Sequence, residues 1–149
     1  MPVAYPNNTQ KLLMNLDNII DLMKDNRGLE SNLGMEFFST PEADECCGRM
    51  PVDERTSQPF GYLSGGATLA LAETLAGAGS LALCPGEICF GMNVSANHLR
   101  SVEKGDTVTA RARIIHQGHR IHVWSVEVRS SDNTLISTVT VTNYIRSKK

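Results

Sequence analysis

The sequence predicts an α+β fold in which one long helix packs against an antiparallel sheet. Residues 65–83 form an apolar run, rich in alanine and glycine on nearly every helical face, as expected of a deeply buried helix. The last third of the chain holds four β-rich runs, and the clearest of them alternates apolar with polar residues. With two further strands expected before the long helix, one helix on one antiparallel sheet is the simplest arrangement.

The first third of the chain predicts one helix and two strands. Residues 9–25 carry apolar residues along one helical stripe, with Thr9 as a cap and a glycine beyond the end. Strands are expected at residues 33–39 and 45–52, around a turn at Pro41.

The rest of the chain predicts a loop, the long helix and the remaining strands. Residues 53–63 form an ordered loop, broken by Pro59 and Gly61, that leads into the helix at residues 65–83. The later strands are expected at residues 87–97, 107–116, 121–130 and 134–145, with hairpin turns at residues 117–119 and 131–133.

Length and composition predict a single domain over residues 1–149, with residues 1–28 as an N-terminal helical segment. A hydrophobic content of 41% is sufficient for one core. A net charge of -2 and an aromatic content of 5% argue against a nucleic-acid partner.

The first residues lack the basic region and apolar run of a signal peptide, which favours a cytoplasmic protein. The cysteines Cys46, Cys47, Cys84 and Cys89 are therefore expected to be reduced, and their spacing argues against a structural zinc site. No apolar stretch is expected to be long enough to cross a bilayer, so no membrane partner is predicted.

Two glycines mark the start of the long helix. Backbone N–H groups at a helix start are free and lie at its positive end, and Gly65 and Gly66 let a ligand approach them closely. Such donors suit the oxyanion that develops in acyl transfer. Alternatively, the two glycines only ease a tight turn and close packing.

Glu73 is a carboxylate within an otherwise apolar helix. A buried glutamate is costly unless it is paired or functional, and a desolvated one can serve as base or nucleophile. Alternatively, Glu73 and Thr74 form a modest exposed stripe on the helix. The residues alone leave both interpretations open.

The spacing of Gly65 and Glu73 bears on assembly. Their separation of eight residues corresponds to about 12 Å along a helix axis, whereas direct attack needs reacting atoms roughly 3 Å apart. If both residues act on one carbonyl, we therefore expect them to come from two different chains.

Basic residues gather in two later segments. His116, His119 and His122 are irregularly spaced for one strand face, so turn and surface histidines are expected there and no metal site. Together with His98 and Arg100, they are candidates for binding phosphates. The alternative is solvated surface charge.

Five segments form a pattern that is specific in combination, although each is weak alone. They are MPVDERTSQPFGYLSGGA at residues 50–67, LAE at 71–73, NHLRS at 97–101, GHR at 118–120 and VW at 123–124. The pattern resembles the hotdog thioesterases that act on aromatic acyl-CoAs, which include 1,4-dihydroxy-2-naphthoyl-CoA and 4-hydroxybenzoyl-CoA hydrolases. The resemblance runs from about residue 30 to the end of the chain.

The resemblance implies a hotdog fold, a long helix wrapped by an antiparallel sheet, in homodimers that often form homotetramers. Glu73 would be the catalytic carboxylate, as nucleophile or as general base for water. The Gly65 N–H of another subunit would polarise the thioester carbonyl, and Gln58 would orient the carbonyl or the water. CoA is part of the substrate, so no cofactor is implied. The residues implied to bind the substrate are Ser64, Gly66, Gly77, Gly91, His98, Leu99, Arg100, Ser101, His116, Gly118, His119 and Arg120.

The chain departs from this family at two positions. Ser64 stands where the family usually has histidine, and Gly77 where its helix often has serine or threonine. Serine carries no charge at neutral pH, and glycine offers no hydroxyl to support a water. From the resemblance as a whole we predict an acyl-CoA thioesterase for an aromatic or medium-chain acyl group. The alternatives are a non-catalytic acyl-CoA-binding protein and a hydratase or dehydratase of the same fold.

Overall fold

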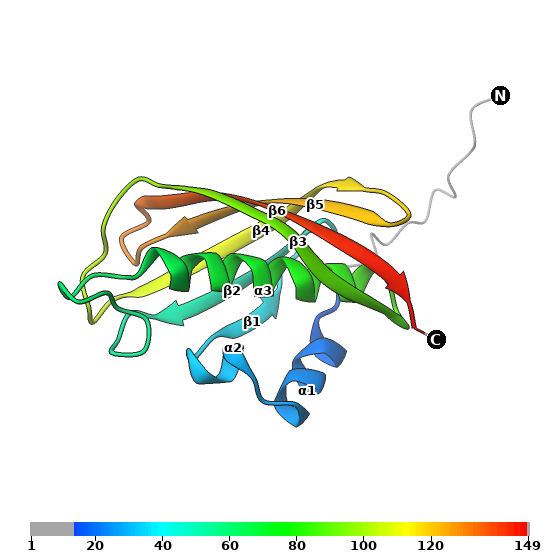
Figure 1. Ribbon diagram of the computed structural model, residues 1–149, viewed down its shortest axis with the longest axis horizontal. Helices are drawn as coiled ribbons and strands as arrows, with labels where there is room; N and C mark the ends of the chain where they lie inside the picture. The colour runs from blue at the N-terminus through cyan, green and yellow to red at the C-terminus, as the bar shows by residue number, and fades with distance from the viewer. Residues whose placement is uncertain (1–13, 149) are drawn as a thin grey trace.

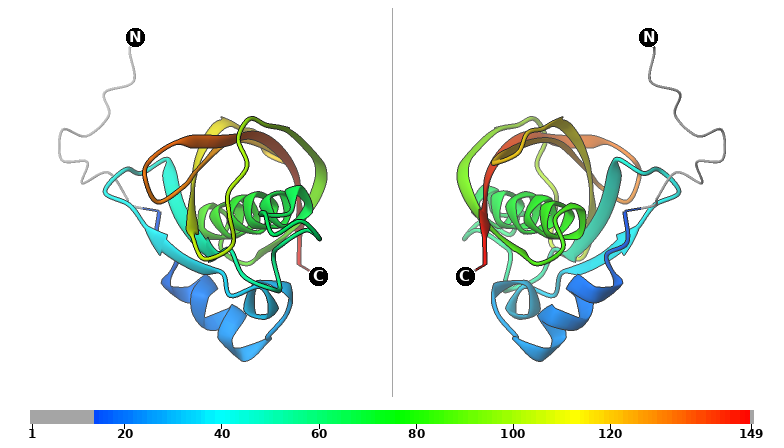
Figure 2. Two further views of the ribbon diagram at one scale, coloured as in Figure 1. Left: turned by 90° about the vertical axis from the view of Figure 1, so that its left-hand side faces the viewer. Right: turned by 90° about the vertical axis from the view of Figure 1, so that its right-hand side faces the viewer.

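A long helix enclosed by a curved sheet forms the centre of the protein, in a computed structural model that describes residues 14–148 (Figure 1). Helix α3 (Gly65–Leu83) has the bounds that the apolar run predicts. Seen along α3, the sheet curves around the helix (Figure 2). The predicted α+β class, with one helix against one antiparallel sheet, is confirmed.

The sheet has six strands in the order β1-β2-β4-β5-β6-β3, and every neighbouring pair is antiparallel. The strands are β1 (Glu36–Ser39), β2 (Glu45–Pro51), β3 (Glu87–His98), β4 (Thr107–Gln117), β5 (Ile121–Arg129) and β6 (Leu135–Ser147). All but β1 begin and end within two residues of the predicted bounds. Strands β1 and β3 are the edges of this sheet.

The core lies between α3 and the concave face of the sheet. Val108, Ala110 and Ala112 of β4 are fully buried and alternate with exposed residues, as their sequence pattern predicts. A Cβ atom at Gly79 would lie 2.5 Å from the Trp124 ring, so the small residues of α3 allow the sheet to approach closely. On the opposite face of α3, Glu73 is exposed, whereas its neighbours Thr74 and Gly77 are half-buried.

The predicted helix at residues 9–25 is shorter than expected, because α1 spans Asp17–Asp25. The predicted cap Thr9 lies outside the described residues. Met14 and Leu16 are buried in a non-helical segment, and the Asn15 side chain accepts a hydrogen bond from the Asp17 N–H (2.8 Å). This local bond favours a turn over a helix.

Strand β1 begins three residues later than predicted, because a short helix, α2 (Leu29–Asn32), precedes it. Gly34 has φ +73° and follows the end of α2, where a left-handed residue commonly closes a helix. Helices α1 and α2 lie together beside β1, on the side of α3 away from β5 and β6 (Figures 1 and 2).

Contrary to the prediction, one apolar stretch is long enough to cross a membrane by length and composition, namely the 19 residues of α3. Half of its most apolar window is buried within the fold. Core helices commonly satisfy the same length criterion, so we explain the apolar character of α3 by its place in the core.

Candidate active site

The start of α3 presents backbone N–H groups without protein partners. Ser64 precedes the helix in an extended conformation, and its side chain makes no capping hydrogen bond. The N–H groups of Ala67 and Thr68 donate to the Ser64 carbonyl, whereas those of Gly65 and Gly66 have no acceptor within residues 14–148. Two free donors therefore lie at the positive end of the helix, where they can bind a developing oxyanion.

The His98 ring lies directly against Gly65. A Cβ atom at Gly65 would be 2.8 Å from the His98 Nε2 atom, a distance at which one of the two residues must move. The His98 Nδ1 atom lies 2.7 Å from the Ser137 hydroxyl, which fixes the ring. Glycine at position 65 thus permits both the close packing of His98 and the access to the backbone N–H.

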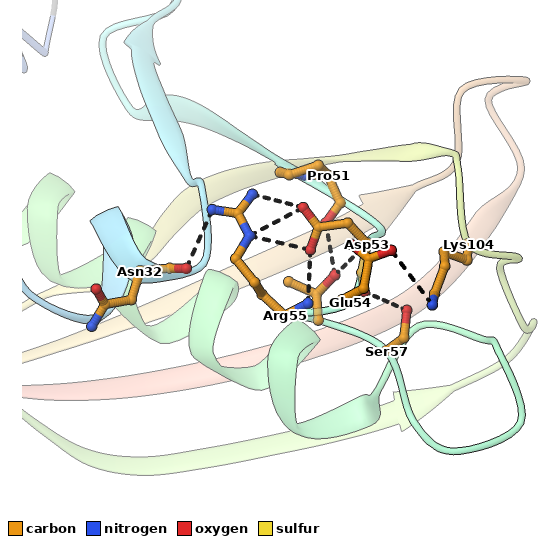
Figure 3. Close-up of polar contacts among 8 residues, drawn as sticks. Asn32, Pro51, Asp53, Glu54, Arg55, Ser57 and Lys104 are labelled. Carbon is orange, nitrogen blue, oxygen red and sulfur yellow. Dashed lines mark hydrogen bonds and ion pairs between the residues drawn. The ribbon is translucent and has the colours of Figure 1, made fainter.

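The loop that leads to α3 is held at its start by short polar contacts (Figure 3). The Thr56 hydroxyl donates to the Pro51 carbonyl (2.8 Å) and accepts from the Asp53 N–H (3.0 Å). The Ser57 hydroxyl donates to the Asp53 carbonyl (2.6 Å). Hydrogen bonds from the Arg55 guanidinium hold the pKa of the Asp53 carboxyl below its usual value. These contacts hold the residues immediately before Gln58 in place.

Gln58 lies within a tight turn of the same loop. Its backbone N–H donates to the Tyr62 carbonyl (2.8 Å), and its side-chain oxygen accepts from the Phe60 N–H. The side-chain nitrogen has no acceptor in the part of the chain that the structure describes. Its two N–H groups are therefore available to a substrate carbonyl or a water.

A cleft of about 300 Å³ brings several predicted site residues together. Gln58, Gly65, His98, Leu99, Arg100 and Ser101 all line it. Ser64 and Gly66 flank Gly65 at the same helix start. The cleft thus combines an oxyanion donor, a carboxamide and a basic segment suited to phosphates.

Glu73 lies on the exposed face of α3 and against β3. A Cβ atom at Gly91 would be 2.0 Å from the Glu73 carboxylate oxygen, so the absence of a side chain at Gly91 leaves room for the carboxylate. Among the described residues, Glu73 forms no hydrogen bond or ion pair. In a single chain Glu73 is therefore exposed, as the alternative interpretation expects, whereas Thr74 is half-buried.

The position of Gly77 is open. A Cβ atom there would meet nothing within 4 Å. Gly77 follows Glu73 by one helical turn, so it lies on the same face of α3. The hydroxyl that the family often has at this position would thus project into space beside the carboxylate.

The predicted residues His116 to Arg120 lie in the β4–β5 hairpin, at the other end of α3. Gly118 and His119 line a separate cleft of about 410 Å³ with Cys84, the residue that ends α3. Since α3 has 19 residues, its two ends are about 27 Å apart. Within one chain, the two predicted phosphate-binding segments are therefore not brought together.

His122 was predicted to be a turn or surface residue, but its side chain is buried. Its Nδ1 atom lies 2.9 Å from the Ser80 hydroxyl, and this hydroxyl accepts from the Trp124 indole N–H (2.8 Å) and from the Asn143 side-chain N–H (3.1 Å). Burial lowers the pKa of His122. The residues alone do not predict this network, although His122 and Trp124, two apart on one strand, share a face.

The cysteine thiols are unsuited to nucleophilic attack. All four are free, and burial raises the pKa of Cys46 to about 12 and that of Cys89 to about 11. Burial also raises the pKa values of Cys47 and Cys84. Because the thiolate is the nucleophile, these residues are weak candidates beside Glu73.

No group of three or more histidine, cysteine, aspartate or glutamate side chains that could hold a metal ion occurs within residues 14–148.

Comparison with known proteins identifies the family. The thioesterase superfamily matches residues 60–137. The 1,4-dihydroxy-2-naphthoyl-CoA hydrolase of Listeria monocytogenes is 36% identical over 123 residues, which cover 82% of this chain and 98% of that protein. The proofreading thioesterase of Cronobacter turicensis is 40% identical over 101 residues, which cover 67% of this chain and 72% of that protein. The crystal structure of a Haemophilus influenzae thioesterase matches with a TM-score of 0.80 and 40% identity over 89% of this chain and 91% of that one. The chain therefore belongs to the thioesterase superfamily and is an enzyme with the hotdog fold.

Proposed function

We propose that the protein hydrolyses an aromatic or medium-chain acyl-CoA to the acid and CoA, in the cytoplasm and without a cofactor. The observation that carries this proposal is the Gly65 N–H at the start of α3, which has no acceptor within residues 14–148 and lies in a cleft with Gln58. The unpartnered carboxylate of Glu73 on the same helix supplies the second reacting group. The hydrolases named above, which act on related thioesters, support the same chemistry.

The proposed mechanism uses both groups on one thioester. The carbonyl oxygen accepts a hydrogen bond from the Gly65 N–H, and the Gln58 carboxamide orients the carbonyl or the water. Glu73 either attacks the carbonyl carbon or takes a proton from a water that attacks it. The C–S bond then breaks, and the CoA thiolate leaves and takes up a proton. If Glu73 attacks, water hydrolyses the resulting anhydride.

The geometry favours a site shared between two chains of a homodimer or homotetramer. Glu73 is not among the residues that line the Gly65 cleft, and the two residues are about 12 Å apart along α3. The edge of β3 offers unpaired backbone, and its residues Phe90 and Met92 are exposed on either side of Gly91. Pairing of β3 with a second copy would cover these apolar side chains and bring a second α3 to the site.

The direct test follows release of the CoA thiol from benzoyl-CoA, a hydroxynaphthoyl-CoA and a series of straight-chain acyl-CoAs. Glu73→Gln keeps the side-chain size but removes the base, so we expect kcat to fall by about a hundredfold or more. Glu42→Gln makes the same change at an exposed carboxylate of the β1–β2 turn and is expected to leave kcat unchanged. Full turnover by Glu73→Gln would refute the role of Glu73. Binding of acyl-CoA without turnover by the unmodified protein would support a non-catalytic acyl-CoA-binding protein instead.

A further inference from the structure

A second, more apolar groove lies beyond Glu73 towards the end of α3. Its volume is about 570 Å³, compared with about 300 Å³ for the cleft at Gly65. Three elements supply its apolar wall, namely Ile19 and Leu22 of α1, Leu81 and Ala82 of α3, and Ile88 and Phe90 of β3. Leu22 of α1 is 53% exposed, so a large apolar side chain of the groove wall lacks a covering group among the described residues.

Two elements connect this groove to the Glu73 carboxylate. Along α3, Glu73, Gly77 and Leu81 follow one another at intervals of four residues and therefore share a face. The open position at Gly77 leaves space between the carboxylate and Leu81. Along β3, Gly91 contacts Glu73, and Cys89, two residues earlier on the same face of the strand, lines the groove. The groove thus begins one helical turn beyond Gly77 on α3 and two residues from Gly91 on β3.

We propose that this groove binds the acyl chain of the substrate and selects straight chains of medium length. The proposal rests on the thioesterase activity proposed above. The distance from Glu73 to Leu81 is eight residues, or about 12 Å along the helix. An extended alkyl chain advances roughly 1.25 Å per carbon with ordinary bond lengths and angles, so about ten carbons reach Leu81 and Leu22.

Gly77 is then a determinant of specificity, since a side chain at this position would narrow the path into the groove. The chain lacks the hydroxyl that the resemblance leads one to expect there, and the same absence leaves room for a longer acyl group. Each methylene that the groove covers should raise kcat/KM about threefold to fourfold, which corresponds to the usual free energy of burying one methylene.

The test compares kcat/KM for straight-chain acyl-CoAs from two to sixteen carbons. We expect a steady rise up to about ten carbons and a plateau or fall beyond. Leu22→Gln places an amide in the groove wall, and should lower the ratio of kcat/KM for decanoyl-CoA to that for butyryl-CoA at least fivefold. Leu29→Gln is the matched control, because Leu29 is an equally exposed leucine (54%) of α2 outside the groove, and should leave the ratio unchanged.

The outcomes separate this proposal from the proposed function. Absence of hydrolysis with every acyl-CoA would overturn the thioesterase activity itself. Hydrolysis with a ratio that Leu22→Gln leaves unchanged, or with no dependence on chain length, would overturn the groove proposal alone. A change in oligomeric mass on Leu22→Gln, with the ratio unchanged, would instead identify the groove as a contact between copies of this chain.

Discussion

Two glycines make room for the neighbours of the proposed reacting groups, because each lacks a side chain where a neighbouring side chain lies. His98 lies where a Cβ atom of Gly65 would be, and the Glu73 carboxylate lies where that of Gly91 would be. The two interpretations of Gly65 from the sequence, close packing and an accessible N–H, are therefore compatible. A substitution at Gly65 should therefore disturb both the packing against His98 and the access to the backbone N–H.

Gly65→Ala is predicted to lower kcat about tenfold to a hundredfold, because the new methyl group would lie 2.8 Å from the His98 ring and displace the helix start or the ring. Removal of one oxyanion donor costs more, about a hundredfold to a thousandfold, so a displaced donor should cost somewhat less. Steady-state thiol release measures the effect.

The neighbouring glycine provides the comparison for this prediction. A Cβ atom at Gly66 would lie 3.6 Å from the Ser64 hydroxyl, an ordinary contact, so Gly66→Ala should lose less activity than Gly65→Ala. If the loss at Gly65 is steric, the double variant Gly65→Ala with His98→Ala should recover part of it. Equal losses in both single variants would argue against a special role for the Gly65–His98 contact.

At the scale of elements, α3 is joined to β5 and β6 by one buried hydroxyl. Ser80 binds His122, Trp124 and Asn143, so the helix and the sheet share a polar contact inside an apolar core. With two donors already directed at its oxygen, the Ser80 hydroxyl donates its own hydrogen to His122. His122 is then neutral in the folded protein.

The stability of the fold is predicted to fall in acid through His122. Burial lowers its pKa from the ordinary value of 6.5, so below pH 6.5 the unfolded chain binds a proton that the folded chain does not. The contribution of His122 is therefore fully present above pH 6.5 and is lost as the pH falls from there through the folded-state pKa. Urea unfolding between pH 8 and pH 5 measures this slope.

A matched pair of variants isolates this slope. His122→Asn should flatten the decline of unfolding free energy between pH 6.5 and pH 5, whatever its effect on stability at pH 8. His119→Asn, at an exposed position of the β4–β5 hairpin, should keep the slope of the unmodified protein. An unchanged slope in His122→Asn would show that another group controls the acid sensitivity.

The elements that the sequence predicts well are those with a long periodic pattern. The apolar run of α3 and the alternation in β4 correspond directly to burial in the structure. The predictions failed where tertiary contacts override local preference. Leu16 fits a helical stripe but enters the core without a helix, and His122, beside a turn, points inward. A single sequence does not show which of two faces a polar residue takes.

At the scale of the whole molecule, helix geometry yields one expectation about how the site is assembled. The fixed rise of a helix separates Gly65 from Glu73, so the residues alone lead to the expectation of two chains. The sequence could not show that Glu73 is exposed in one chain or that the edge of β3 beside it is unpaired. Both depend on the order of strands in the sheet, which local patterns do not encode.

A shared site predicts that two inactive variants restore activity when mixed. In a dimer with one Gly65→Ala chain and one Glu73→Gln chain, one site carries both defects and the other carries neither. If chains exchange at random in an equimolar mixture, half of the dimers are mixed, and about a quarter of all sites are intact. Unfolding the two proteins together, refolding them and measuring thiol release should therefore give about a quarter of the unmodified activity. A site built within one chain, by contrast, would leave the mixture no more active than the average of its two components.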